Sequence, residues 1–351
     1  MQLEIEKKIK AAISDRVFPG CVVGLVRRDG SRLVLPAGRF TYETTSPIVK
    51  PDSIYDVASI TKVIPTSSLA LLLIDEGRLK LDDQLIEYVP EFNNKDRNKV
   101  LIKHLLTQTL DYNFVLSTLK DRPSDEILKS IFTSPFKSQP GTSFLYSNAS
   151  SILLALVVER IFGRSLSKLA EEYFFHPLKM QRTTFNPLEE YSKDEIVPSE
   201  VQPERGLVHG EVHDEGTYAL KTKMIGGAAG LFSTVPDLLN FMEMLLNGGQ
   251  IKGHKYFSEE IINQIQTNQI SNLRESAGLG WELNQPHYMG SHCGPNTFGK
   301  TGFTGCGIVC DIKKQIAFSI LSNYTYPYRK SDKDLINRFR REIADIIFRD
   351  E

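Results

Sequence analysis

The chain has 351 residues, of which 41% are apolar and 24% are charged, a composition typical of a globular protein with one large domain or two. The formal net charge of −1 gives no electrostatic reason to expect nucleic acid or an acidic membrane surface as a partner. The apolar run from Ile152 to Val158 is far shorter than the roughly 18 residues of a membrane span, so we expect no transmembrane segment.

The first predicted elements are a helix and a hairpin. Apolar residues at helical spacing predict an amphipathic helix over about the first dozen residues: Ile5, Ile9, Ala12 and Ile13. Two apolar runs, 21–26 and 33–35, then flank Asp29-Gly30, which is a typical hairpin turn. We therefore expect an antiparallel sheet to begin here.

Helical patterns dominate the middle of the chain, and strand patterns return near its end. The clearest helical pieces between Ser59 and about Gly253 are 104–106, 126–128, 149–161 and 237–246. A final helix follows four predicted strands at 279–283, 296–300, 307–312 and 315–321. These patterns predict an α+β fold with a discontinuous sheet lobe, residues 1–58 and 275–351, and a mainly helical lobe, residues 59–274. We expect the site in the cleft between the lobes.

The start and the cysteines of the chain bear on its compartment. Residues 1–8 lack the basic and then apolar pattern of a signal peptide, so we expect a cytoplasmic protein unless a leader was removed. Four cysteines are too few for a disulfide framework at this length, and we expect them to be small buried apolar residues: Cys21, Cys293, Cys306 and Cys310.

The first candidate motif lies at the start of a long apolar segment, where Ser59 precedes Lys62 by three residues. On a helix these side chains share a face, so the hydroxyl and the amine could act as a nucleophile and its base. The spacing alone selects nothing, because three other serines have a lysine three places later: Ser117, Ser134 and Ser165. Only Ser59 leads into a segment that is apolar on most sides through Ile74, where burial would lower the pKa of the lysine. Pro65 should bend the helix just past Lys62.

A second motif, Tyr146-Ser147-Asn148, opens the apolar helix that runs to about Ile161. A tyrosine hydroxyl beside a cationic lysine can be held partly ionised and can move protons, while the asparagine amide both donates and accepts hydrogen bonds. The alternative is a loop tyrosine that packs its ring.

A third motif, Lys300-Thr301-Gly302, lies on a predicted strand that leads into Phe303. Glycine at this place lets another backbone or a ligand approach the strand edge closely. The lysine could anchor a substrate carboxylate or act electrostatically on the tyrosine. The alternative is a solvated lysine at the end of a strand.

Together, the three motifs resemble those of the serine β-lactamase and penicillin-binding-protein superfamily, whose S-x-x-K, Y-x-N and K-T-G boxes converge on one cleft. The tyrosine of the second box is similar to that of class C β-lactamases, D,D-peptidases and related serine esterases. The resemblance spans roughly Ala12 to Asn323 and includes 77–83 and 230–234. It implies the β-lactamase/transpeptidase-like fold, a serine hydrolase without a cofactor, and a small ester, amide or β-lactam as the substrate.

Carried over to this chain, the resemblance implies a catalytic set of Ser59 as the acylated nucleophile and Lys62 and Tyr146 as its proton-transfer partners. It also implies a set of substrate-binding residues: Asn148, Lys300, Thr301, Gly302 and Phe303. The backbone amides of Ser59 and Phe303 would form the oxyanion hole. The loop before the second motif departs from the family, because Gln108 and Leu110 stand where relatives usually show histidine and serine. Such a loop would change which substrate the protein accepts. Because cell-wall peptides and β-lactams are met outside the cytoplasm, the lack of an expected export segment favours an esterase or amidase.

Three other interpretations compete. A Ser-His-Asp hydrolase would need the G-x-S-x-G turn, which is absent. Alternate residues in 209–214 could bind a metal if extended, but we expect a hydrogen-bonded loop instead and no metal site: His209, Glu211, His213 and Asp214. Finally, the same boxes could serve a penicillin-binding protein that is acylated at Ser59 and releases its product too slowly to be an enzyme.

Overall fold

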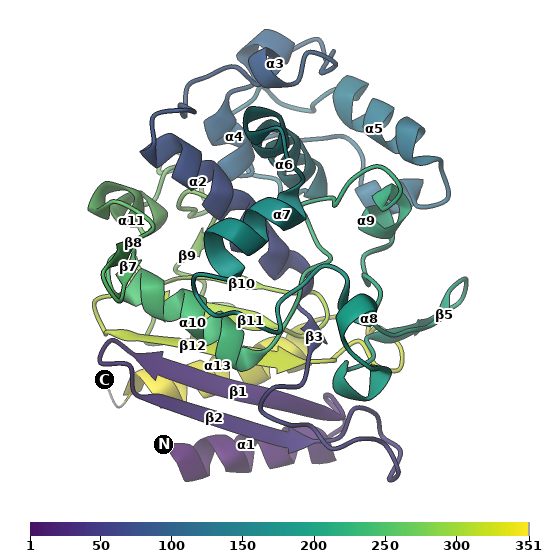
Figure 1. Ribbon diagram of the computed structural model, residues 1–351, viewed down its shortest axis with the longest axis vertical. Coiled ribbons are helices and arrows are strands. Elements are labelled where there is room, and N and C mark those ends of the chain that lie inside the picture. Colours follow the sequence, from purple (N-terminus) through teal and green to yellow (C-terminus); the bar gives the residue numbers. More distant parts are fainter. Residues whose placement is uncertain (350–351) are drawn as a thin grey trace.

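The computed structural model describes residues 1–349, and within them an antiparallel sheet of six strands organises the fold (Figure 1). The strands lie in the order β2 (Arg32–Gly38), β1 (Gly20–Arg27), β12 (Ile316–Ser322), β11 (Gly307–Asp311), β10 (Phe298–Thr301) and β9 (Glu282–Leu283). The pairing of β1 with β12 begins with Cys21 opposite Ser322, so it joins strands from the two ends of the chain. The predicted hairpin and the predicted return of strands near the C-terminus are confirmed.

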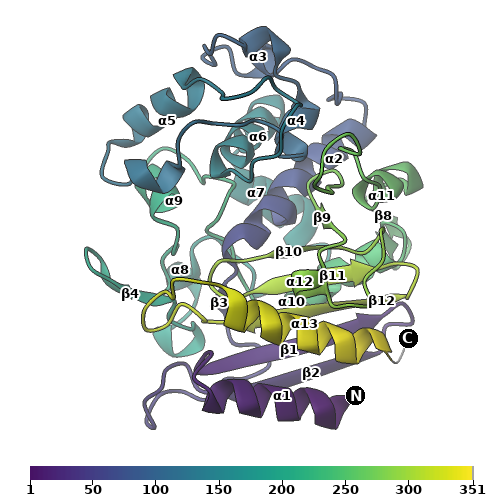
Figure 2. The same cartoon turned by 180° about the vertical axis from the view of Figure 1, so that it is seen from behind.

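Helices cover both faces of the sheet. On one face α1 (Gln2–Ser14) lies beside α13 (Asp334–Arg349), as Figure 2 shows. On the other face α10 (Val235–Leu246) packs against β1 and β12. Gly24 of β1 allows this close packing, because a Cβ there would overlap the side chain of Val235. We had expected 237–246 in the helical lobe, but its apolar face is buried on the sheet instead.

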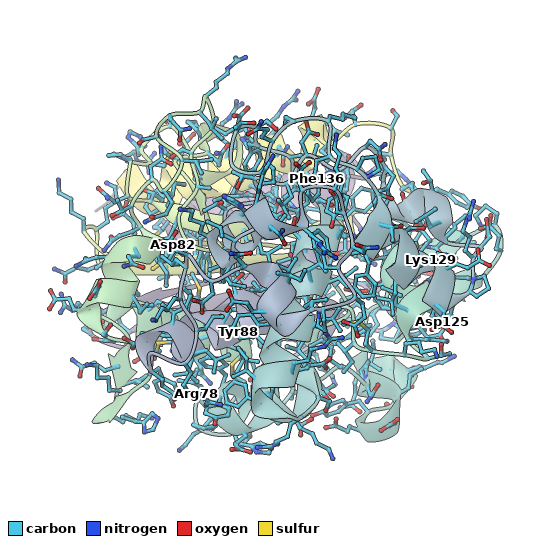
Figure 3. All side chains as sticks on the ribbon, turned by 90° about the horizontal axis from the view of Figure 1, so that it is seen from above. Arg78, Asp82, Tyr88, Asp125, Lys129 and Phe136 are labelled. Carbon is cyan, nitrogen blue, oxygen red and sulfur yellow. The ribbon has the colours of Figure 1, made fainter. Side chains whose placement is uncertain are left out.

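Most of the other helices form the part of the molecule above the sheet in Figure 1, and Figure 3 looks down onto it. These are α2 (Ser68–Asp75), α3 (Leu85–Tyr88), α4 (Ile102–Leu106), α5 (Ser124–Thr133), α6 (Asn148–Phe162), α7 (Leu166–Ala170), α9 (Glu215–Leu220) and α11 (Glu259–Ile265). The short α8 (Pro187–Glu190) lies beside the sheet instead. The short α12 (Pro286–Met289) packs against α13 instead. Helix α6 is buried along most of its length and contacts α2, α3, α4 and α7, so it is the centre of this part.

Three two-stranded ribbons complete the described structure. They pair β3 (Tyr55–Asp56) with β6 (Phe232–Ser233), β4 (Glu200–Gln202) with β5 (Gly206–Val208), and β7 (Gln250–Ile251) with β8 (His254–Lys255). The first ribbon matters most for the site, because β3 leads directly into the segment that carries Ser59.

The apolar segment after β3 is less regular than the helix that we predicted. Residues Ala58–Lys62 form a 3₁₀ helix, Val63–Ser67 form a wider helical turn, and α2 follows. The bend falls just past Lys62, as expected from Pro65, and Ile64 has non-helical torsion angles there. Side chains three residues apart eclipse in a 3₁₀ helix, so this conformation aligns Ser59 with Lys62 more closely than an α-helix would.

By length and composition alone, the segment Ala58–Asp75 could cross a membrane, which corrects our expectation that no segment would qualify. In the fold, 78% of this segment is buried. Its apolar side chains pack against α6 and the neighbouring helices of the core.

Candidate active site

Lys62 is the centre of the site. Its ammonium nitrogen lies 3.0 Å from Ser59 Oγ, 2.7 Å from Asn148 Oδ1 and 2.8 Å from the carbonyl oxygen of Ala228. The side chain is almost fully buried, with 2% of the residue exposed. Burial lowers the pKa of Lys62, although the nearby Tyr146 acts in the opposite direction. A lysine with a lowered pKa beside a serine hydroxyl is suited to accept the proton of that hydroxyl.

The other three serine–lysine pairs do not form such a unit. Lys120, three residues after Ser117, forms an ion pair with Glu204 at 2.8 Å instead. Lys137 and Lys168, which follow Ser134 and Ser165, are exposed to solvent. The tertiary structure therefore distinguishes Ser59 from serines that have the same spacing.

The turn that presents Ser59 is held by the buried carboxylate of Asp56. Ala58, the residue before the serine, has a φ of 47°, a left-handed conformation that is unfavourable for a residue with a side chain. Asp56 Oδ1 accepts a hydrogen bond from the Ala58 amide at 2.7 Å, and Asp56 Oδ2 accepts one from the His213 amide at 2.7 Å. Asp56 thus stabilises a strained turn and ties it to the loop at His213.

Tyr146 lies between two lysines. The ammonium nitrogens of Lys300 and Lys62 are 4.1 and 5.1 Å from the centroid of its ring. Burial of the hydroxyl end would raise the pKa of Tyr146, but the two positive charges outweigh it and the pKa lies below its usual value. The residue as a whole is 41% exposed, and it lines the cavities beside Ser59. The phenol is therefore in an environment that favours its ionised form.

Gln108 holds the segment between Tyr146 and Asn148. Its side-chain oxygen accepts a hydrogen bond from the Ser147 amide at 2.8 Å, and its backbone carbonyl accepts one from the Leu145 amide at 2.9 Å. The residue has a φ of 57°, so it too is in the left-handed region. The sequence marked Gln108 only as a departure from the family pattern, and the structure shows that it supports the second motif.

Lys300 is not the solvated lysine of our alternative interpretation. Its ammonium nitrogen lies 2.6 Å from Glu282 Oε1, and Tyr288 donates to Glu282 Oε2 at 2.8 Å. Burial opposes the charge of Lys300, but Glu282 outweighs it and raises the pKa of the lysine. Sequence reasoning missed Glu282. An acidic residue inside the short strand pattern 279–283 was the only indication of it.

The strand that carries Lys300 also places Thr301, Gly302 and Phe303 beside Ser59. A Cβ at Gly302 would overlap the carbonyl oxygen of Val57, so glycine is needed for β10 to approach the nucleophile segment. Within residues 1–349, no hydrogen bond uses the backbone amide of Ser59 or Phe303. Two such donors next to the serine are what an oxyanion hole requires.

Two cavities meet at these residues, and both are lined by Ser59, Tyr146 and Phe303. The first has a volume of about 290 Å³ and polar or charged walls that include Glu282, His287, Thr301, Lys333 and Arg340. The second has a volume of about 280 Å³ and an apolar side formed by Phe114, Val115, Leu116 and Leu145. One part of a substrate bound at Ser59 can therefore lie in the polar cavity, and another part can lie against the apolar side of the second cavity.

The four polar residues of 209–214 do not come together as one ligand set. Asp214 Oδ2 accepts from Asn148 Nδ2 at 3.1 Å, and His213 Nε2 lies 2.6 Å from the buried Glu200. His209 contacts backbone carbonyls, whereas Glu211 forms ion pairs outside the site. Across residues 1–349, no group of three or more His, Cys, Asp or Glu side chains could hold a metal ion. His213 and Asp214 instead line the cavity beside Ser59 and contact Asp56 and Asn148.

The model of the family described as Beta-lactamase matches residues 5–341. The chain belongs to the beta-lactamase family. A protein of Escherichia coli (strain K12), which carries the provisional name D-alanyl-D-alanine carboxypeptidase, is 30% identical over 302 residues, or 77% of this chain and 69% of the relative. Like other members of the family, the protein is a serine hydrolase.

Solved structures share the fold over nearly the whole chain. EstCE1, described as a hydrolase with promiscuous acyltransferase activity, has a TM-score of 0.77 at 19% identity and covers 99% of this chain and 98% of its own. The octameric penicillin-binding protein homologue from Pyrococcus abyssi has a TM-score of 0.73 at 22% identity, covering 93% and 75%. The expected β-lactamase/transpeptidase-like fold is thereby confirmed.

Proposed function

We propose that this protein hydrolyses a small ester or amide through an acyl-enzyme formed on Ser59. The observation that carries the proposal is the 3.0 Å distance between Ser59 Oγ and the buried Lys62 ammonium nitrogen. A buried lysine with a lowered pKa is a general base only if a nucleophile lies within hydrogen-bond reach, and Ser59 does.

In the first half of the reaction, Ser59 Oγ attacks the carbonyl carbon of the substrate while its proton moves to Lys62 or Tyr146. The negative charge on the carbonyl oxygen is stabilised by the amides of Ser59 and Phe303, each worth about 3 to 4 kcal/mol in comparable sites. The bond to the leaving group then breaks, and the leaving group takes the proton. In the second half, water gives a proton to the same groups as its oxygen attacks the acyl carbon. The bond between the acyl carbon and Ser59 Oγ then breaks and Oγ takes that proton, which frees the acid and restores Ser59.

The two cavities support a substrate with unlike ends. The apolar walls at Phe114, Leu116 and Leu145 suit an apolar acyl group, because each buried methylene contributes about 0.8 kcal/mol to binding. The cavity at Thr301 and Lys333 suits a polar or anionic leaving group. A short acyl ester fits this description best. A D-amino-acid peptide, which the names of the curated relatives suggest, is the second candidate because its terminal carboxylate would face the basic residues.

Labelling with a fluorophosphonate probe tests the nucleophile. Intact-protein mass spectrometry should show one adduct on the wild-type chain and none on Ser59→Ala. The matched control is Ser117→Ala, because Ser117 also lines the apolar cavity and also has a lysine three residues later. Labelling of Ser59→Ala equal to that of the wild type would refute the assignment.

Burst kinetics with p-nitrophenyl butyrate distinguish an enzyme from a slowly deacylating penicillin-binding protein. Continued release of p-nitrophenol after the first equivalent supports the hydrolase. Release that stops after one equivalent per chain would show that Ser59 is acylated without turnover, and would favour the binding protein instead.

A further inference from the structure

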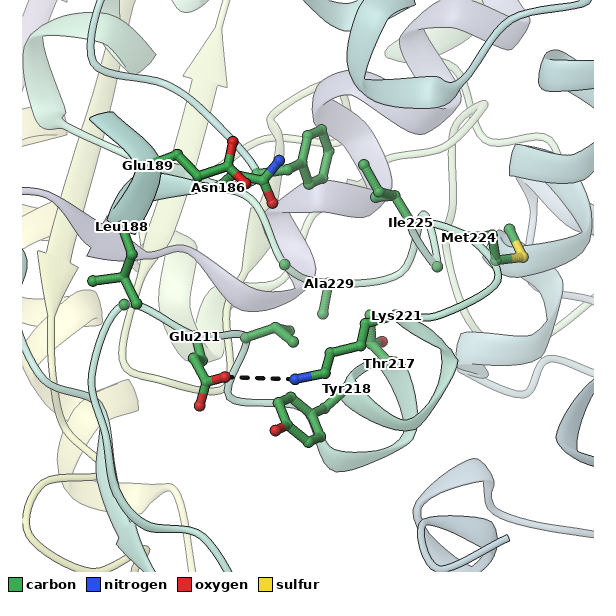
Figure 4. A pocket seen from close by; sticks show the side chains of 15 residues that line it. Asn186, Leu188, Glu189, Glu211, Thr217, Tyr218, Lys221, Met224, Ile225 and Ala229 are labelled. Atoms are coloured by element: carbon green, nitrogen blue, oxygen red, sulfur yellow. Dashed lines mark ion pairs between the residues drawn. The ribbon is translucent and has the colours of Figure 1, made fainter. Parts of the chain in front are cut away.

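A third cavity adjoins the apolar cavity beside Ser59 (Figure 4). Its volume is about 280 Å³. It is enclosed by the segment around α8, the turn before His213, the end of α9 and the segment 224–230. Ala229 lines both this cavity and the apolar cavity beside Ser59. The neighbouring Ala228 carbonyl accepts the hydrogen bond from Lys62 described above. The two cavities thus share Ala229 in their walls.

The interior of this cavity is apolar. Phe185, Val212, Met224 and Ile225 line it, and each is only half-buried because part of its surface faces the space. Gly230, which has a φ of 104°, adds no side chain to the wall, and a Cβ there would reach 3.5 Å from Val212. An apolar group of a ligand would cover apolar surface that the protein leaves exposed, and burial of that surface favours binding.

The mouth of the cavity carries both signs of charge. Glu211 Oε1 lies 3.5 Å from Lys221 Nζ, and Figure 4 shows the two side chains reaching toward each other from the turn and from the end of α9. Their side chains are 45% and 50% exposed, so their attraction is screened by water and the pair is weak. A ligand that carries an ammonium and a carboxylate can replace this pair. The ammonium of such a ligand can pair with Glu211 while its carboxylate pairs with Lys221. Both protein charges then keep a partner of opposite sign.

We propose that this cavity binds a zwitterionic apolar amino acid, with leucine as the model ligand. Its ammonium would face Glu211, its carboxylate would face Lys221, and its side chain would lie among Phe185, Met224 and Ile225. A simple anion would meet the like charges of Glu189 and Glu211. A simple cation would meet those of Lys221 and of Arg205, which lies 3.6 Å from Glu211. The distribution of charge at the mouth of the cavity therefore favours a zwitterionic ligand over a simple anion or a simple cation.

Isothermal titration calorimetry with L-leucine, 3-methylbutylamine and 4-methylpentanoate tests the proposal on the full chain. Leucine should bind once per chain, at least about tenfold more tightly than either singly charged analogue. Ile225→Trp, which fills the cavity, should abolish this binding. Its matched control is Val115→Trp, which places the same indole in the cavity beside Ser59 and should leave leucine binding unchanged.

Two exposed substitutions keep the test valid if Ile225→Trp folds poorly. Glu211→Gln and Lys221→Met should each weaken leucine binding about two- to fivefold, the expected effect of losing one exposed ion pair. Lys223→Met is their control, because Lys223 is an exposed lysine on the same segment that pairs with Asp125 outside the cavity. The proposal is wrong if leucine does not bind, if an analogue binds more tightly, or if only Val115→Trp removes the binding.

Discussion

Replacement of Gln108 by leucine tests whether the second motif depends on this one side chain. The change keeps the size of the residue but removes the oxygen that accepts from the Ser147 amide at 2.8 Å. The contacts of the Gln108 amide nitrogen, at 3.4 and 3.5 Å, are too long to matter much. The expected loss is therefore that of one good hydrogen bond with its donor left unpaired, about 1 to 3 kcal/mol.

If this energy keeps Tyr146 and Asn148 in place for the reaction, kcat should fall by about 5- to 150-fold, since 1.4 kcal/mol is a factor of ten. KM should change little, because Gln108 lines neither cavity beside Ser59. The assay is steady-state hydrolysis of p-nitrophenyl butyrate, and urea unfolding of the same samples checks that the variant is folded.

A second variant separates positioning from general destabilisation. Gln108→Glu keeps an acceptor for the Ser147 amide but adds a negative charge near Tyr146, which disfavours the phenolate and raises the pKa of the tyrosine. It should recover most of the wild-type kcat at alkaline pH, with the acid limb of its profile moved to higher pH. A kcat that stays at the wild-type value in Gln108→Leu, while stability falls by about 1 to 3 kcal/mol, would show that Gln108 has a structural role only.

Three further predictions follow from other contacts. Glu282→Gln should move the acid limb of the kcat/KM profile to lower pH, because removal of this carboxylate lowers the pKa of Tyr146. An acid limb that moves to higher pH would contradict this prediction. Burial lowers the pKa of His104 to about 4, so the unfolded state binds a proton that the folded state does not, and stability should fall between about pH 6.5 and pH 4. The loss should approach roughly 3 kcal/mol in urea unfolding, and His104→Gln should abolish this part of the pH dependence. Gly302→Ala should reduce kcat/KM at least about 100-fold, because the added Cβ would push β10 away from Val57. The control Gly294→Ala should stay active, because the nearest atom to a Cβ at Gly294 is 3.9 Å away. Equal activities of the two variants would refute the packing argument.

Much of the fold and most of the candidate residues could be predicted from the sequence. Local patterns were sufficient for the first helix, the hairpin and the late strands, because alternation and helical periodicity reflect which face of each element is buried. The three motifs named Ser59, Tyr146 and Lys300 correctly as neighbours, since the order of the boxes along the chain matches that of a known family. Their catalytic roles stay predictions until the proposed labelling and kinetics are done.

What surrounds these residues could not be predicted, because it depends on the tertiary structure. The irregular turn at Val63–Ser67, the packing of α10 on the sheet and the contacts of Gln108 and Glu282 all depend on residues distant in sequence. A glutamine or a glutamate in a short pattern gives no indication of its partner, because hydrogen bonds and ion pairs form between side chains that folding brings together. In the sequence we also overlooked Ala58–Asp75, which is long and apolar enough to span a membrane, and hydropathy alone cannot tell the core of a folded protein from a lipid bilayer.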